Sequence, residues 1–224
     1  MPTKSPAILF DIDGTLVDSN YMHVAAWSRA LEEVGAPVDS WRVHRAIGMD
    51  SKKLRESLLG DRAEELGERA SELHSRYYAA DAGNLRPFAS ARELVATVAK
   101  HGLQAVLATS APEDELRLLR SALKIEDDVA TVTSAADVGE AKPAPDVVQV
   151  ALERAGVDAE NAVMVGDTVW DVEAATRAGV RCVALRSGGT GGAELSAAGA
   201  IAVYDDAADL LAHFDASPLA ALRG

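Results

Sequence analysis

Six short apolar runs, most of them separated by helical patterns, limit the folds that this chain can adopt. The runs span residues 7–10, 104–109, 129–133, 162–165, 180–185 and 201–203. Patterns typical of helices lie between most of them, at residues 90–101, 113–123, 145–155 and 170–178. Strands that alternate with helices form parallel sheets joined by crossover connections. The sequence therefore predicts an α/β fold built on a parallel sheet.

One segment interrupts the alternation and predicts a second, smaller domain. Residues 19–84 are helical in pattern, rich in charge and poor in strand-like runs. This segment is too long for a simple crossover, and Pro87 disfavours helix at the residue before it. We expect an α/β core formed by residues 1–18 and 85–224 and a small all-helical domain formed by residues 19–84. The two chain crossings between them would form a hinge.

Composition restricts the partners and the location of the protein. Of the 224 residues, 48% are apolar, which is ample for a buried core. The net charge of −13 argues against nucleic acid and anionic membranes as partners, and no apolar run approaches transmembrane length. The single cysteine, Cys182, excludes an intramolecular disulfide and is typical of a small buried strand residue. We expect a cytoplasmic protein, a monomer or a weak homodimer, whose last residues, 217–224, fray or pack loosely.

The first apolar run ends in two acids, Asp11 and Asp13, with Gly14 directly after them. Ligand sites of open α/β sheets lie at the carboxyl ends of the strands, so these acids stand where chemistry is expected. Two neighbouring carboxylates repel each other unless a cation or a proton lies between them. The acid pair therefore requires a positive partner from elsewhere in the chain.

Two later segments offer groups that could complete such a site. Thr109 ends the second run and Ser110 follows it, where their hydroxyls could either cap the next helix or donate to a phosphate oxygen, helped by backbone N–H groups. Lys142 precedes Pro143 in a loop. It is either a solvated surface lysine or the cation that holds a phosphate against the carboxylates.

A second pair of acids follows the fourth run, as Asp167 and Asp171. An acid at a helix start is commonly a cap or a partner of the helix dipole. Together with Asp11, however, these residues would form an oxygen-rich site of the kind that Mg²⁺ prefers. The sequence thus offers a metal site made from two strand ends.

In this order, the segments resemble the haloacid dehalogenase-like (HAD) superfamily of phosphotransferases. The resemblance consists of Asp-x-Asp-Gly-Thr-Leu-Val-Asp-Ser from Asp11, an apolar strand ending in Thr109, Lys142-Pro143, and Gly-Asp-x-x-x-Asp ending in Asp171. It implies a Rossmann-like core, and residues 19–84 look like the family's helical cap domain. It also implies a phosphatase that acts on a small phosphorylated metabolite.

The resemblance assigns a role to each candidate residue. Asp11 is implied to be the nucleophile that forms an aspartyl-phosphate, and Asp13 the general acid and base. Mg²⁺ is implied to be held by Asp11, the backbone carbonyl of Asp13, Asp167 and, through water, Asp171. Groups implied to grip the phosphoryl oxygens are Thr109, Lys142 and backbone N–H groups near Asp13, Gly14 and Ser110. The acid at position 13 favours phosphate esters over C–Cl or C–P substrates.

Two other functions remain open at this point. His23 stands at the offset from Asp11 that a histidine has in β-phosphoglucomutase, where it couples cap closure to acid–base chemistry; alternatively it is a polar residue on a helix face. Against the mutase, Ser51 stands where that enzyme carries an arginine for the distal phosphate, and the Gly166–Asp171 segment looks more like that of phosphoglycolate phosphatase. The other alternative is a non-catalytic metal-binding module.

Overall fold

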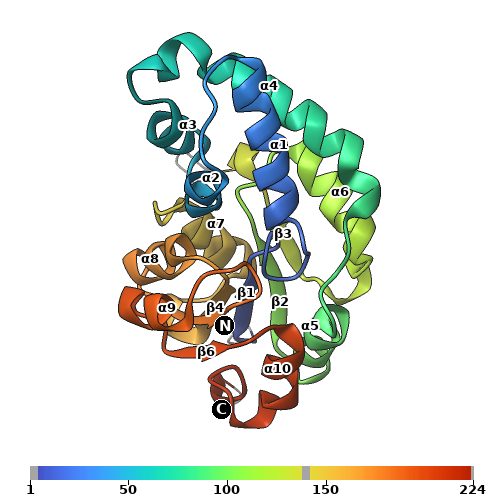
Figure 1. The fold of residues 1–224 in the computed structure, drawn as a ribbon. Helices are drawn as coiled ribbons and strands as arrows, with labels where there is room; N and C mark the ends of the chain where they lie inside the picture. The colour runs from blue at the N-terminus through green and yellow to red at the C-terminus, as the bar shows by residue number, and fades with distance from the viewer. Residues whose placement is uncertain (1–4, 138–141, 223–224) are drawn as a thin grey trace. The chain divides into compact units, whose positions relative to one another are not determined.

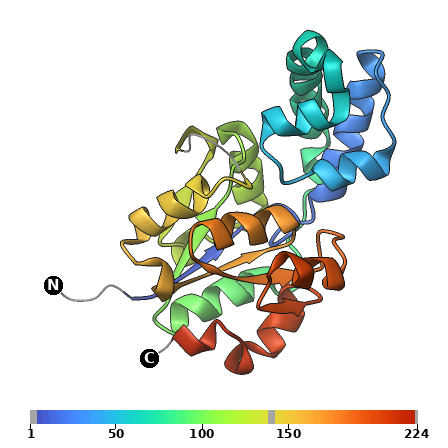
Figure 2. The same cartoon turned by 90° about the vertical axis from the view of Figure 1, so that its left-hand side faces the viewer.

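The computed structural model describes residues 5–137 and 142–222, and these divide into two compact units. One unit comprises residues 1–18 and 86–224, and the other comprises residues 19–85. The chain passes between them only twice, after Asp18 and after Leu85. The described part of the first unit contains a sheet with helices on both faces, and the second is all-helical (Figures 1 and 2).

The sheet of the first unit has six parallel strands in the order β3-β2-β1-β4-β5-β6. Their bounds are β1 Ala7–Phe10, β2 Gln104–Ala108, β3 Thr131–Thr133, β4 Ala162–Gly166, β5 Arg181–Leu185 and β6 Ala202–Tyr204. The α/β prediction is thus confirmed, and each strand lies within one or two residues of its apolar run. The largest difference is at the run 129–133, where the strand β3 begins two residues later than the run because its first residue paired with β2 is Thr131.

Strand β1 lies in the middle of the sheet, and all four of its side chains are fully buried. Its last residue, Phe10, pairs with Leu107 of β2 and with Val165 of β4. The chain continues from β1 to one side of the sheet and later returns to the other side at β4. This is a topological switch point, where the carboxyl ends of the strands leave room for a ligand.

Crossover helices cover both faces of this sheet. Helices α7 (Asp146–Ala155) and α8 (Val169–Arg177) cover one face, and α5 (Ala91–Lys100) and α10 (Ala207–Ala212) cover the other (Figure 2). The core between α7, α8 and the sheet consists mainly of alanine and valine, which lets these helices approach closely. Helices α6 (Glu113–Leu123) and α9 (Gly192–Ala198) complete the set. Cys182 is 2% exposed within this core, as expected, and burial raises the pKa of its thiol.

The end of the chain differs from the prediction. Residues 214–216 and 220–222 form short 3₁₀ turns, and Leu219 and Leu222 are buried. The expectation that the tail frays or packs loosely is therefore wrong as far as residue 222; residues 223–224 lie outside the described part. Two leucines among small residues give little periodicity, so the sequence pattern does not indicate this packing.

The second unit contains α1 (Asn20–Glu33), α2 (Ser40–Ala46), α3 (Ser51–Leu59) and α4 (Ala63–Asp81). Its own apolar core is formed by residues from all four helices, among them Trp27, Val43, Leu58 and Ala70. The charges of this segment lie on solvated faces, as in the pairs Arg69–Glu72 and Arg29–Asp81. Across both units, none of the described helices is long and apolar enough to cross a membrane.

Candidate active site

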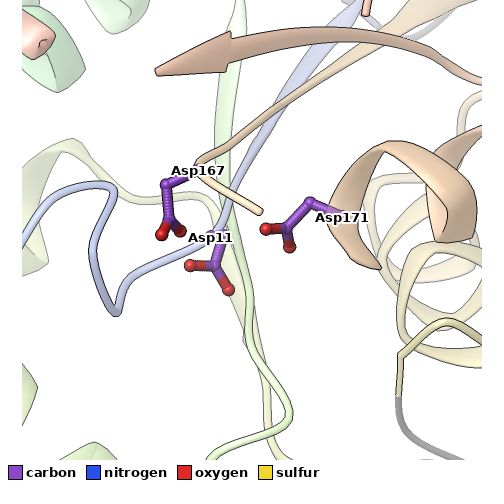
Figure 3. Close-up of side chains that lie close together, drawn as sticks. All are labelled: Asp11, Asp167 and Asp171. Carbon is purple, nitrogen blue, oxygen red and sulfur yellow. The ribbon is translucent and has the colours of Figure 1, made fainter. Parts of the chain in front are cut away.

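Three buried acids meet at the carboxyl edge of the sheet, at its switch point. Asp11 follows β1, Asp167 follows β4, and Asp171 lies in the first turn of α8. One carboxylate oxygen from each lies within 4.8 Å of those of the others, and the three groups face a common space (Figure 3). Carboxylate oxygens at this spacing suit a hard divalent cation. The residues present therefore fit a metal such as Mg²⁺.

Lys142 supplies the positive charge among these acids. Its side chain is almost fully buried, and its ammonium forms ion pairs with Asp11 Oδ1 and, at 2.6 Å, with Asp171 Oδ1. Burial by itself lowers the pKa of Lys142, but the charges of the two carboxylates outweigh it and raise the pKa overall. The lysine thus stays protonated inside the site, and the solvated-lysine alternative is excluded.

The protonation of Asp11 depends on opposing effects. Its pKa is raised overall from 3.8 to about 7: burial is the largest cause, Lys142 opposes it, and the charges of Asp171 and Asp13 act in the same direction as burial. Asp13 itself is only partly exposed and lies two residues further along the chain. A bound cation would act in the same direction as Lys142 and lower the pKa of Asp11, because it adds positive charge next to the carboxylate.

Two threonines that the sequence analysis did not single out orient the acids. Thr15 is fully buried, and its hydroxyl donates to Asp167 Oδ1 at 3.0 Å. Thr168 donates to Asp171 Oδ2 from its backbone N–H at 3.0 Å and from its hydroxyl at 2.6 Å. The signal for Thr168 was available, because a threonine three residues before an acid can form a capping box. Thr15 bonds to a residue 152 positions away, which no local pattern reveals.

Asp171 belongs to the acid cluster and also caps the N-terminus of helix α8. It forms the capping box of α8 with Thr168, which confirms the interpretation of Asp171 as a helix cap. A Cβ added at Gly166 would lie 2.5 Å from Asp171 Cβ and 2.6 Å from its Cγ, so only glycine leaves room for this side chain. The glycine before Asp167 thus allows the second acid of the motif to reach the site.

Thr109 lies at the same edge, after β2, and is buried. Its hydroxyl oxygen accepts the N–H of Ala111 at 3.0 Å, while the N-cap residue of α6 is Pro112. The simple N-cap alternative is therefore wrong, and the hydroxyl hydrogen of Thr109 is left to donate to another acceptor. Ser110 follows it and is half-buried.

Gly14 lies in a tight turn directly after the acid pair. Gly14 adopts φ +73°, which favours glycine, and its N–H donates to the carbonyl of Val17 at 2.9 Å. The turn after the acid pair thus uses this donor internally. The expectation that backbone N–H groups near Asp13 and Gly14 bind the phosphoryl oxygens stays a prediction.

His23 lies in the helical unit, among other aromatic rings. Its Nδ1 is 3.0 Å from Nε2 of His74, and its ring stacks on Tyr78 with centroids 4.1 Å apart. His74 in turn stacks on Trp27 at 4.5 Å. Both histidines are buried, so His23 contributes to the packing of this unit as well as being a candidate for substrate contact.

The chain resembles known proteins over nearly all of its length. A family model described as haloacid dehalogenase-like hydrolase matches residues 8–185. A phosphoglycolate phosphatase of Rhodospirillum rubrum is 31% identical over 214 residues, which cover 91% of this chain and 88% of that protein. The crystal structure of a hydrolase from Pseudomonas syringae is 37% identical, with a TM-score of 0.90 over 95% of this chain and 99% of that one.

A solved structure of lower sequence identity shares the same fold. The β-phosphoglucomutase of Clostridium difficile superposes with a TM-score of 0.79 over 91% of this chain and 92% of its own, at 20% identity. At that identity the likeness establishes the shared fold alone.

Proposed function

The chain belongs to the haloacid dehalogenase-like hydrolases, and from that premise we propose that it hydrolyses small phosphate monoesters with the help of Mg²⁺. The observation that carries the proposal is the buried Lys142, which pairs with Asp11 and Asp171 of the three-acid cluster that also contains Asp167. Such a group of acids around one lysine suits phosphoryl transfer, which depends mainly on alignment and on neutralisation of charge.

In this proposal the side chain of Asp11 attacks phosphorus. A bond forms between its carboxylate oxygen and phosphorus, and the bond from phosphorus to the leaving oxygen breaks. Asp13 gives its proton to that oxygen, so the product leaves as an alcohol. Asp13 then takes a proton from water, which attacks the aspartyl-phosphate, releases inorganic phosphate and restores Asp11. Only the ionised form of Asp11 can attack, and the ammonium of Lys142 favours that form.

The remaining residues bind the phosphoryl group and the metal. We propose that Lys142 and the hydroxyl of Thr109 donate to phosphoryl oxygens, with backbone N–H groups near Ser110. The metal would be held by Asp11, the backbone carbonyl of Asp13 and Asp167, and through water by Asp171. When bound, Mg²⁺ supplies positive charge that offsets the charge of the phosphoryl group.

The helical unit is proposed to be the cap of this enzyme. Its two short connections to the core, at residues 18–19 and 85–86, support a hinge, and a cap that closes would exclude bulk water. His23 would then assist substrate binding from this unit. Because curated relatives are named phosphoglycolate phosphatase, phosphoglycolate is the first substrate to test. The cytoplasmic location and the monomeric or weakly dimeric state remain predictions.

The proposal is tested by measuring phosphate release from phosphoglycolate, sugar phosphates, nucleotides and polyol phosphates, with Mg²⁺ and with excess chelator. We expect release from at least one monophosphate, loss of release with chelator, and a loss of at least about 10³-fold in Asp11→Asn. Asp158→Asn, at an exposed acid before β4, is the matched control and should retain full activity. A folded wild type that releases phosphate from none of these compounds would refute the proposal.

The same experiment separates the alternatives. Isomerised product with glucose 1,6-bisphosphate as activator, without free phosphate, would indicate the mutase. Binding of Mg²⁺ without any turnover would indicate the non-catalytic module.

A further inference from the structure

Helix α8 contacts the Lys142-Pro143 segment at two separate points. Near its start, Asp171 Oδ1 lies 2.6 Å from the ammonium of Lys142. At its last residue, Arg177 donates from Nη1 to the backbone carbonyl of Pro143 at 2.5 Å. One rigid element therefore holds both the tip of the lysine side chain and the backbone next to its Cα.

The contact from Arg177 is suited to fixing this backbone. Proline has no N–H, so the carbonyl is the only backbone group through which Pro143 can form a hydrogen bond. Arg177 is itself held by Glu173, one turn earlier on α8, whose Oε2 accepts from Nη2 at 2.8 Å. The guanidinium is planar and stays charged, so this pairing fixes the direction of the donor that reaches Pro143.

Another arginine secures the earlier part of the same connection. Arg154, on α7, donates to the carbonyl of Val132 and pairs with Asp137, which accepts the N–H of Ser134 at 2.8 Å. These contacts fix the chain before residue 138, whereas Arg177 acts directly after Lys142. Arg154 therefore provides a natural comparison for Arg177.

The backbone of Lys142 needs such support because of what its side chain must do. An ammonium on a four-carbon stem has little directional preference of its own, and here it must serve both Asp11 and an incoming phosphoryl oxygen. We propose that Arg177 is a positioning residue for Lys142, acting through the Pro143 carbonyl. This inference rests on the proposed phosphatase function of the same site. A displacement of about 1 Å at a catalytic group can cost up to about 10²-fold in rate.

Steady-state kinetics with p-nitrophenyl phosphate and Mg²⁺ test the catalytic part. We expect Arg177→Ala to lower kcat by about 10-fold or more while KM changes less than about threefold. Arg177→Lys, which retains one charged donor, should recover part of the loss, and Arg181→Ala, at an exposed arginine of β5, should behave as wild type. The thermal midpoint should change little, because the side chain of Arg177 is 49% exposed and its removal leaves no cavity.

Lysine acetylation, followed by mass spectrometry, tests the position of Lys142 without any turnover. In wild type, buried Lys142 should react much more slowly than exposed Lys100. Arg177→Ala should raise the rate at Lys142 severalfold without changing Lys100, and Arg154→Ala should raise it less.

The two experiments distinguish failure of the inference from failure of the proposed function. If wild type turns over substrate but Arg177→Ala retains both its kcat and the slow labelling of Lys142, the inference is overturned. If wild type turns over nothing, the proposed function fails, and the labelling rates still decide whether Arg177 positions Lys142.

Discussion

Replacing Lys142 by methionine should destabilise the fold, and the loss should depend on pH. The variant leaves three buried carboxylates within 4.8 Å of one another without their cation. At an effective dielectric constant of 20, each like-charge pair at that distance repels by about 3 kcal/mol. Since one acid can take up a proton instead, we expect a net loss of about 3–5 kcal/mol in the free energy of unfolding near pH 8.

The sign of the pH dependence follows from Asp11. Its pKa in the folded protein is already raised from 3.8 to about 7, mainly by burial, and removal of Lys142 should raise it further because Lys142 opposes this shift. Between the unfolded and the folded pKa, the folded state holds a proton that the unfolded state lacks, so stability falls as pH rises through this window. The deficit of the variant should therefore be smaller at pH 5 than at pH 8.

Urea unfolding of Lys142→Met at these two pH values, with and without Mg²⁺, is the assay. Lys142→Arg, which keeps the charge, should lose less than Lys142→Met. Lys100→Met, at an exposed lysine, should stay within about 0.5 kcal/mol of wild type. A loss below about 1 kcal/mol that is the same at both pH values would refute the reasoning from buried charge.

Three further changes have defined outcomes. Gly166→Ala should cost about 1–3 kcal/mol in urea unfolding, because the new Cβ meets Asp171 Cβ at 2.5 Å; an unchanged midpoint would contradict this. Thr15→Val should weaken Mg²⁺ binding about 10-fold in calorimetric titration, because it removes the hydrogen bond to Asp167; equal affinity would show that Thr15 only fills space. Burial, and then the neighbouring His23, lower the pKa of His74 to about 2. Below pH 6.5 the unfolded state therefore binds a proton at His74 that the folded state does not, so the unfolding free energy decreases as pH falls. His74→Gln should make the unfolding free energy flatter than that of wild type between pH 6.5 and 5, where wild type loses about 2 kcal/mol through this residue; parallel curves would exclude the effect.

The strands and the acids at their ends could be predicted from sequence because both signals are local. An apolar run marks a buried strand, and the residue after it must lie at the edge of the sheet, which places Asp11 and Asp167 without knowledge of the partners. Lys142 could be suggested only because the acids require a cation, since its loop has no periodic pattern.

The contacts that orient these residues could not be predicted. Thr15 bonds to Asp167 across 152 positions and Arg177 to Pro143 across 34, and neither partner is indicated by spacing or residue type. The hydrogen bond of the Gly14 N–H within its own turn could not be predicted for a related reason. A tight turn can use its N–H donors for hydrogen bonds to its own carbonyls, and whether it does so depends on backbone angles that the sequence does not specify.

The charges at the switch point explain how such a cluster can exist in a folded chain. When ionised, Asp11, Asp167 and Asp171 carry three negative charges against the one positive charge of Lys142, which leaves two negative charges in a buried site. Burial is the main cause of the raised pKa of Asp11, and the charges of Asp171 and Asp13 add to it. A divalent cation would cancel these two negative charges, and a phosphate group would otherwise have to enter a site of its own sign in a chain of net charge −13. An arrangement that is unfavourable by itself would thus favour the binding of a divalent metal together with an anionic substrate.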